Sequence, residues 1–302
     1  MATNTSPRCK TSDTVDIQPV SPAVNQLDTK EGNIGSITRL TLGERDPTKM
    51  NKTILLVGET GAGKSTLINA LVNYAMGVKS YKRREESQTE SQTSDVIVYE
   101  VFGHEDRTLP FSLTIIDTPG YGHTEGIERD VLVSERLLDL FRSTDGVREI
   151  DAVCLVLKAS DNRLSDRLCT GVSVWKRHRG EHRCPHHTSD FEPENVLQAL
   201  KDAQIRCAKN EEGQPVHFMF DNTQKTERNK RNERALKNAW ESTEDQISQF
   251  ADFLKKTKPQ NLRDTVEVLN TRIRLTACIH KLQERVECIE QKQREINRLR
   301  KL

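Results

Sequence analysis

The chain has 302 residues, of which 34% are hydrophobic, so it is long enough for one ordinary domain or two small ones with part of it left unpacked. Its 46 Lys and Arg residues against 45 Asp and Glu give a net charge of +1, which excludes a strongly basic nucleic-acid binder. The sequence contains no run of about 18 apolar residues, and residues 1–30 lack the apolar stretch expected of a signal peptide. We therefore expect a cytoplasmic protein without a transmembrane segment, and leave peripheral membrane contact open. Seven cysteines without a CxxC pair predict reduced thiols.

Residues 1–35 are rich in Ser, Thr, Asp, Asn and Pro and have no hydrophobic period, which predicts a disordered N-terminal arm. From residue 36 to 258, short apolar runs alternate with amphipathic segments, a pattern typical of a mainly parallel α/β sheet. One antiparallel edge hairpin is also predicted. In chain order the predicted elements are a strand at 54–57, a helix at 65–76, the hairpin strands 96–102 and 113–116, a helix at 131–141, a strand at 152–157, a helix at 196–200, a strand at 216–220 and helices beyond 230.

The last part of the chain, residues 259–302, is predicted to be a coiled-coil helix. Apolar residues recur there with the heptad spacing in which positions a and d face a partner helix. The d positions hold Leu275, Leu282, Ile289 and Ile296, and the a positions hold Ile279, Val286 and Gln293. We expect a homo-oligomer formed through residues 268–302, and a helix that folds back on the α/β domain is the alternative.

A glycine-rich motif follows the strand at 54–57 and matches G-x-x-x-x-G-K-[ST]. Its residues are Gly58, Glu59, Thr60, Gly61, Ala62, Gly63, Lys64, Ser65 and Thr66. The glycines let successive backbone N–H groups surround a phosphate, and the following helix adds the positive end of its dipole. We expect Lys64 to reach the β and γ phosphates and Ser65 to bind Mg²⁺. The motif therefore predicts binding of a nucleoside triphosphate.

A second motif, Asp117-Thr118-Pro119-Gly120, follows the strand at 113–116. The carboxyl end of a strand is where α/β sheets bind their ligands. We expect Asp117 to hold Mg²⁺ through water and the Gly120 N–H to sense the γ phosphate. The two motifs with a hairpin between them have the layout of a GTPase more than of an ATP synthase or an AAA-type motor.

The runs GETGAGKST and DTPGYG resemble the first and third G motifs of septin-like and immunity-associated (paraseptin) P-loop GTPases. More closely, residues 39–298 resemble a family of fish G-domain proteins with a C-terminal coiled coil. The resemblance implies a P-loop NTPase G domain that binds GTP and Mg²⁺. It also implies that the loop before the hairpin is switch I, in which Thr93, or as second choice Thr89, closes over Mg²⁺.

Two departures from GTPase patterns affect catalysis and base recognition. Tyr121 stands where small signalling GTPases have a water-orienting Gln, so we expect slow hydrolysis that rests on positioning by Lys64, Thr93 and Mg²⁺. The sequence contains no [NT]-K-x-D motif, so guanine specificity is implied by the resemblance alone. Asn222, in a segment similar to the Phe-Asn-Asn of the immunity-associated group, and Asp190 are the candidates to bind the base.

The segment 169–187 holds clustered Cys and His residues but no apolar run, although a G domain needs a buried strand in this part of the chain. Its spacing matches no zinc template. A one-base shift of possible codons for residues 175–187 yields a helix end and an apolar strand, so we hypothesise that the segment is translated out of frame. The basic run between 225 and 234 has no interleaved aromatic residues, which favours a solvated loop over a nucleic-acid site.

The sequence thus predicts a GTP-binding protein, expected to be a slow Mg²⁺-dependent GTPase that assembles through its C-terminal helix. A non-hydrolysing, nucleotide-dependent scaffold and an ATP-binding P-loop protein are the alternatives. No nucleic-acid partner is expected.

Overall fold

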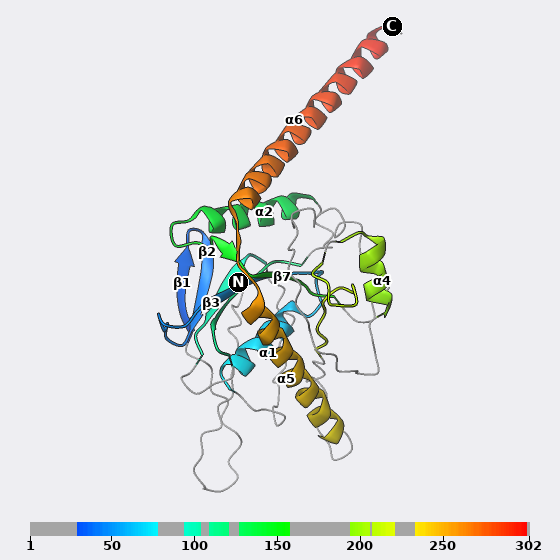
Figure 1. The fold of residues 1–302 in the computed structure, drawn as a ribbon. Coiled ribbons are helices and arrows are strands. Elements are labelled where there is room, and N and C mark those ends of the chain that lie inside the picture. The colour runs from blue at the N-terminus through cyan, green and yellow to red at the C-terminus, as the bar shows by residue number, and fades with distance from the viewer. Residues whose placement is uncertain are drawn as a thin grey trace.

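A six-stranded sheet forms the centre of the computed structural model, in the order β1-β2-β4-β5-β3-β7 (Figure 1). The structure describes residues 29–77, 94–103, 109–120, 127–157, 194–205, 207–220 and 233–300. The pairs β2/β4, β5/β3 and β3/β7 are parallel, whereas β1/β2 and β4/β5 are antiparallel. The strands are β1 (Thr29–Ile34), β2 (Ile37–Leu42), β3 (Asn51–Val57), β4 (Ile97–Val101), β5 (Ser112–Asp117) and β7 (Ala152–Leu155). The predicted mainly parallel α/β class is confirmed.

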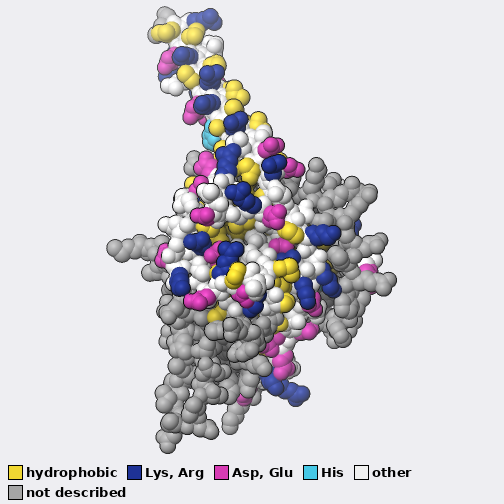
Figure 2. Space-filling view, turned by 60° about the vertical axis from the view of Figure 1, so that its left-hand side comes forward, with side chains coloured by type: hydrophobic (Ala, Val, Ile, Leu, Met, Phe, Trp, Pro, Cys, Tyr) yellow, Lys and Arg dark blue, Asp and Glu magenta, His cyan; other side chains and the backbone are white. Residues whose placement is uncertain are grey.

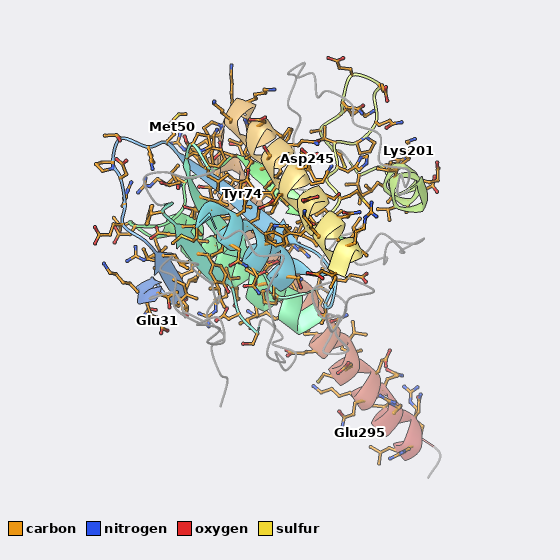
Figure 3. The ribbon with its side chains drawn as sticks, turned by 90° about the horizontal axis from the view of Figure 1, so that it is seen from below. Glu31, Met50, Tyr74, Lys201, Asp245 and Glu295 are labelled. Atoms are coloured by element: carbon orange, nitrogen blue, oxygen red, sulfur yellow. The ribbon has the colours of Figure 1, made fainter. Side chains whose placement is uncertain are left out.

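The helices cover both faces of this sheet, which explains why β3 reads as one continuous apolar run. Ile54 and Leu56 face the core made with α1 and α5, while Leu55 between them faces the core made with α2 and the start of α6. Figure 3 shows α1 and α5 side by side on their face of the sheet. The helices are α1 (Lys64–Ala75), α2 (Ile127–Arg142), α4 (Glu194–Asp202), α5 (Glu233–Lys256) and α6 (Arg263–Leu299). Within the described residues, none of them has a stretch apolar enough to span a membrane.

The predicted hairpin is confirmed as β4/β5, but its predicted place at the sheet edge is wrong. Strand β2 pairs with the outer side of β4, and β1 then pairs with β2. Residues 29–34 therefore form a strand, not part of the disordered arm predicted for 1–35. The hairpin β1/β2 turns at Gly35, whose φ of 58° suits glycine. It buries Ile34 and Ile37 against the α2 side of the sheet. Two buried residues do not form a hydrophobic period that could be seen in the sequence.

The strand predicted at 216–220 is also wrong, since these residues form no strand in the structure. Their packing is made by side chains instead. The ring of Phe218 lies 5.2 Å from that of Phe250 and 5.8 Å from that of Phe253, both on α5. The Met219 N–H donates to the side-chain oxygen of Gln246 at 3.1 Å. The apolar run thus correctly predicted packing against the core, where these residues are partly buried, but the hydrogen-bonded strand that it also predicted does not form.

A buried ion pair fixes the end of α5 to the amino end of β3. The Lys52 ammonium lies 2.8 Å from the Asp151 carboxylate and donates to the Thr257 carbonyl at 2.8 Å. The second Asp151 oxygen accepts from the Thr53 N–H. Next to it, β6 (Glu149–Ile150) pairs with β8 (Gln260–Asn261), immediately before α6. The start of α6 is therefore held by the sheet.

The long helix predicted for 259–302 is confirmed over the range of α6. It extends away from the sheet beyond its first turns (Figure 1). Its pairing with another helix and the boundary at residue 258 stay predictions.

Candidate functional site

The glycine-rich loop joins the carboxyl end of β3 to the first turn of α1, as the motif predicts. Gly61 and Gly63 have φ angles of 77° and 102°, a region that favours glycine. Gly63 is the N-cap of α1, so no side chain caps the helix, and no acidic residue lies in its first turn. The first N–H groups of α1 and its positive dipole end are therefore available for an anion.

Two further glycines allow neighbouring loops to approach this one. A Cβ at Gly58 would collide with the Val156 carbonyl oxygen just after β7. A Cβ at Gly120 would collide with the backbone and hydroxyl of Thr60. The loop after β5 thus lies directly on the glycine-rich loop. The two predicted motifs meet at the carboxyl edge of the sheet.

Lys64 is buried inside the glycine-rich loop. Its ammonium donates to the Gly58 carbonyl at 2.9 Å and to the Glu59 carbonyl at 3.2 Å. Burial lowers the pKa of Lys64, while the negative charge of Asp117 acts in the opposite direction. A buried ammonium held by neutral carbonyls gains most from an incoming anion, because it has little water to lose.

Asp117 is the last residue of β5 and is almost fully buried between Ile97 of β4 and Leu56 of β3. The negative charge of Asp117 acts on groups inside the sheet as well as on Lys64. Burial first, and the Asp117 carboxylate second, raise the pKa of the nearby Tyr99 phenol. A carboxylate here is the oxygen ligand that Mg²⁺ prefers, directly or through water.

Thr118 is a contact that the sequence analysis did not single out. Its fully buried hydroxyl donates to the Leu56 carbonyl at 2.8 Å, which ties the loop after β5 to the strand before the glycine-rich loop. The DTPG motif contains this threonine, so the signal was present in the sequence. Its partner is 62 residues away, and no local pattern indicates it.

The residues present fit a phosphate-bearing ligand with Mg²⁺. The loop supplies a buried ammonium, backbone N–H groups and the half-buried Ser65 hydroxyl, and the strand β5 beside it ends at the Asp117 carboxylate. The Thr60 hydroxyl is buried and has no hydrogen-bond partner in the structure described. A buried polar atom of this kind costs free energy unless a ligand satisfies it.

Several predicted residues lie outside the described ones, so the structure does not place them. These are Thr89, Thr93, Tyr121, Asp190 and Asn222, together with the whole segment 169–187. Within the described part of the chain, no group of three or more His, Cys, Asp or Glu side chains could hold a metal ion.

A family model described as Septin matches residues 48–131. This septin-like region contains both motifs and the strands β3, β4 and β5 between and beside them, so the septin-like resemblance of the G domain is confirmed. Septins are GTP-binding P-loop GTPases, and GTPases of this family generally bind GTP with Mg²⁺. The loops that meet at the carboxyl edge of β3 and β5 are the ones that the match covers.

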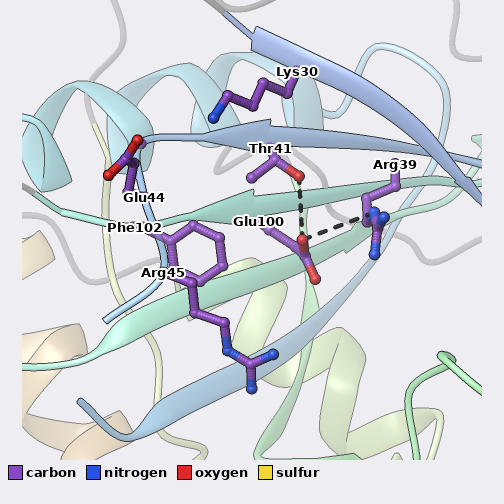
Figure 4. A pocket seen from close by; sticks show the side chains of 8 residues that line it. Lys30, Arg39, Thr41, Glu44, Arg45, Glu100 and Phe102 are labelled. Atoms are coloured by element: carbon purple, nitrogen blue, oxygen red, sulfur yellow. Dashed lines mark hydrogen bonds and ion pairs between the residues drawn. The ribbon is translucent and has the colours of Figure 1, made fainter. Parts of the chain in front are cut away.

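A surface pocket lies at the opposite edge of the sheet from the septin-like motifs (Figure 4). Gly43 follows β2 and Phe102 follows β4, which runs antiparallel to β5, so the pocket is remote from Asp117. The Glu100 carboxylate accepts from the Thr41 hydroxyl at 3.2 Å and lies 3.9 Å from the Arg39 Nε. The lining residues are Lys30, Arg39, Thr41, Gly43, Glu44, Arg45, Glu100 and Phe102. Two carboxylates among three cations make it a poor match for a phosphate.

Proposed function

We propose that this chain is a GTP-binding protein that hydrolyses GTP slowly with Mg²⁺ and assembles through α6. One observation carries the nucleotide part of the proposal. Lys64 lies buried between two carbonyls of the glycine-rich loop, in the field of a buried Asp117 carboxylate. A charged amine and a carboxylate kept this close at the edge of a sheet suit a ligand that carries both anionic phosphates and a cation.

The proposal assigns a role in ligand binding to residues of both motifs. Lys64 exchanges its carbonyl partners for the β and γ phosphate oxygens, and backbone N–H groups of residues 58–66 surround the phosphates. Ser65 and Asp117 hold Mg²⁺, which supplies charge neutralisation of the phosphates when bound. The Gly120 N–H contacts the γ phosphate, which makes the loop after β5 sensitive to whether that phosphate is present.

The remaining assignments rest on the resemblance to septin-like and immunity-associated GTPases. Thr93 completes the Mg²⁺ site from the preceding loop, and Asn222 binds the guanine edge. Tyr121 replaces the water-orienting Gln of small signalling GTPases, so turnover is slow. Assembly rests on the apolar residues of α6, which are exposed in the single chain.

The test is nucleotide binding followed by single-turnover hydrolysis with the purified full chain. Lys64→Ala is expected to weaken GTP binding about tenfold to a hundredfold, because it removes charge-assisted hydrogen bonds worth about 1.5–3 kcal/mol. Lys237→Ala is the matched control, since this lysine is exposed on α5 and pairs with Glu241 in the adjacent turn. Equal loss in both variants contradicts the proposed site.

Two further outcomes separate the alternatives. Tight GTP binding without any turnover in the wild-type chain favours the non-hydrolysing scaffold. Competition in which ATP displaces GTP at equal concentration favours an ATP-binding P-loop protein over a GTPase.

A further inference from the structure

Thr60 lies in a tight turn at the tip of the glycine-rich loop. The Ala62 N–H donates to the Glu59 carbonyl at 3.1 Å, which closes a four-residue turn with Thr60 and Gly61 at its centre. The φ of 77° at Gly61 is the positive angle that a type II turn needs at its third residue. The turn therefore fixes the backbone of Thr60 and the direction in which its side chain leaves the loop.

The Thr60 hydroxyl is enclosed where this loop touches the loop after β5. A Cβ at Gly120 would collide with the hydroxyl oxygen and also with the backbone of Thr60. Thr118, two residues before Gly120, donates to the Leu56 carbonyl at 2.8 Å and so holds the second loop against the sheet. The contact between Thr60 and Gly120 is thus supported on both sides, by the turn on one and by Thr118 on the other.

In this position the hydroxyl is an unused hydrogen-bond donor. It is shielded from solvent, and no group in the part of the chain that the structure describes hydrogen-bonds to it. A buried hydroxyl without a partner costs free energy, whereas a valine of the same shape would avoid that cost. Packing of the two loops alone therefore does not explain a threonine at this position. An acceptor that arrives with a ligand does explain it.

The surroundings of Thr60 indicate the charge of that acceptor. The Lys64 ammonium donates to the carbonyl of Glu59, the residue before Thr60, at 3.2 Å, so a positive charge lies next to the turn. Gly120, which touches the hydroxyl, carries a backbone N–H. An ammonium, a backbone N–H and a hydroxyl are all donors, and donors gathered in this way suit an anionic oxygen.

We propose that the Thr60 hydroxyl donates a hydrogen bond to the γ phosphate and thereby makes the chain select GTP over GDP. The proposal rests on the proposed nucleotide site and adds the side chain that distinguishes the two nucleotides. The backbone N–H groups at the start of α1 are available to the phosphates of either nucleotide. Thr60 instead touches Gly120, the residue assigned to the γ phosphate, which GDP lacks.

The free energy of this hydrogen bond is gained with GTP alone. With GDP, the Thr60 hydroxyl stays without an acceptor, as it does in the nucleotide-free chain. With GTP, the cost of the unpartnered hydroxyl is removed and a charge-assisted hydrogen bond forms. A side chain of the same shape without the hydroxyl should therefore lose the preference for GTP and keep the affinity for GDP.

Equilibrium binding to the full chain with Mg²⁺ tests the selectivity. The ligands are GDP and a non-hydrolysable GTP analogue with an imido group between the β and γ phosphates, and calorimetry measures both dissociation constants. Thr60→Val is expected to weaken binding of the analogue about tenfold and binding of GDP less than about twofold, because a single charge-assisted hydrogen bond to the γ phosphate is lost. Thr60→Ser keeps the hydroxyl and is expected to retain the preference.

Thr271→Val is the matched control. It makes the same chemical change on an exposed residue of α6, whose hydroxyl donates to the Glu267 carbonyl one turn earlier. Both dissociation constants should stay as in the wild-type chain. A change in either of them would show that the loss of any threonine hydroxyl affects binding, and would overturn the assignment to Thr60.

Two measurements separate a ligand-binding role from a structural one. Without nucleotide, Thr60→Val should unfold thermally at the same temperature as the wild-type chain or at a higher one, because the unpartnered hydroxyl is gone. A lower unfolding temperature means that the hydroxyl supports the fold, and overturns the proposal. In ³¹P NMR of the bound analogue, this variant should shift the γ resonance and leave the α resonance in place, and an unmoved γ resonance contradicts the hydrogen bond.

The remaining failures are distinguishable. Equal weakening of GDP and analogue by Thr60→Val overturns the contact with the γ phosphate, and equal weakening by Thr60→Val and Thr60→Ser shows that shape rather than the hydroxyl matters. Either result leaves the nucleotide site standing. A wild-type chain that binds neither nucleotide overturns the proposed function and this inference together.

Discussion

Helices α5 and α6 follow each other in the chain and are both amphipathic, but the structure uses their apolar sides differently. The apolar side of α5 packs against the sheet and α1. The buried residues of this helix are Trp240, Thr243, Ile247, Phe250, Ala251 and Leu254. In α6 Leu269 is buried, whereas the apolar residues from Leu275 to Leu299 are exposed (Figure 2). The same kind of pattern therefore produces a core helix in one case and an open surface in the other.

The difference comes from what lies next to each helix. The six residues between them, 257–262, contain the Thr257 carbonyl bound by Lys52 and the short strand β8. Beyond these contacts the first turns of α6 still pack into the core beside α2, whereas the later turns are exposed. Periodicity identifies which residues share a face of a helix, but covering that face depends on where the rest of the chain lies.

The largest expected effect concerns the anchor that separates the two helices. Asp151→Ala leaves the Lys52 charge buried without its partner and the Thr53 N–H without an acceptor. We expect a loss of about 3–5 kcal/mol in the free energy of unfolding, measured by chemical denaturation. The double variant Lys52→Met/Asp151→Ala should recover part of this loss, because the uncompensated charge is gone. A loss below about 1 kcal/mol in the single variant contradicts the role of the pair as an anchor.

A matched pair of substitutions sharpens the comparison directly. Ile247 of α5 is 1% exposed and Ile279 of α6 is 54% exposed. Ile247→Ala is expected to reduce the free energy of unfolding of the G domain by about 2–5 kcal/mol through loss of burial and formation of a cavity. Ile279→Ala, measured at a concentration where the chain is monomeric, is expected to change it by less than about 0.5 kcal/mol. Similar losses in the two variants would mean that α6 packs on the G domain in solution.

The parts of the fold that the sequence predicted are those specified locally. The glycines, Lys64 and the apolar strand before them are contiguous, so the strand, the loop and α1 follow from one stretch of sequence. Asp117 was predicted at the end of its strand for the same reason. What brings the two motifs together is the close approach of Gly120 to Thr60, and this contact has no local signal.

The errors have a common physical origin in contacts between distant segments. Strand β1 was predicted to be disordered because its own composition is polar, and it is held by pairing with β2 and by burial of Ile34. Residues 216–220 are apolar because Phe218 packs on α5, and this apolar run was taken for a strand. Strand pairing and helix packing bury similar side chains, so a short apolar run does not distinguish them.

The boundary between the packed first turns of α6 and its exposed length gives a smaller expected effect. Leu269→Ala removes a buried side chain from the first turns of α6 and is expected to reduce the free energy of unfolding by about 2 kcal/mol, because the site opens to solvent nearby. Leu275→Ala, six residues further along, is the control and should leave unfolding of the monomer unchanged. Amide hydrogen exchange in the first turns of α6 should rise in the first variant only. Equal exchange in both variants would place the boundary elsewhere.

The smallest expected effect concerns α2, the helix against which the first turns of α6 pack. The Asp139 carboxylate of α2 accepts hydrogen bonds from the Ser36 hydroxyl at 2.6 Å and from the Ser36 N–H at 3.2 Å. These bonds connect α2 to the turn of the hairpin β1/β2. These two bonds, in that order, lower the pKa of Asp139, with a smaller contribution from the charge of Arg136.

A carboxyl group whose pKa is lower in the folded chain stabilises the fold above its ordinary pKa, and this stabilisation is lost as the pH falls through the lowered value. The site is exposed, so we expect less than about 1 kcal/mol. Asp139→Asn keeps an acceptor for Ser36 but removes the charge. The difference in free energy of unfolding between wild type and this variant should therefore be present at pH 7 and shrink toward zero near pH 2. A difference that is already near zero at pH 7 would show that the amide and the carboxylate hold α2 equally well, and that the charge of Asp139 contributes nothing to the surface that supports α6.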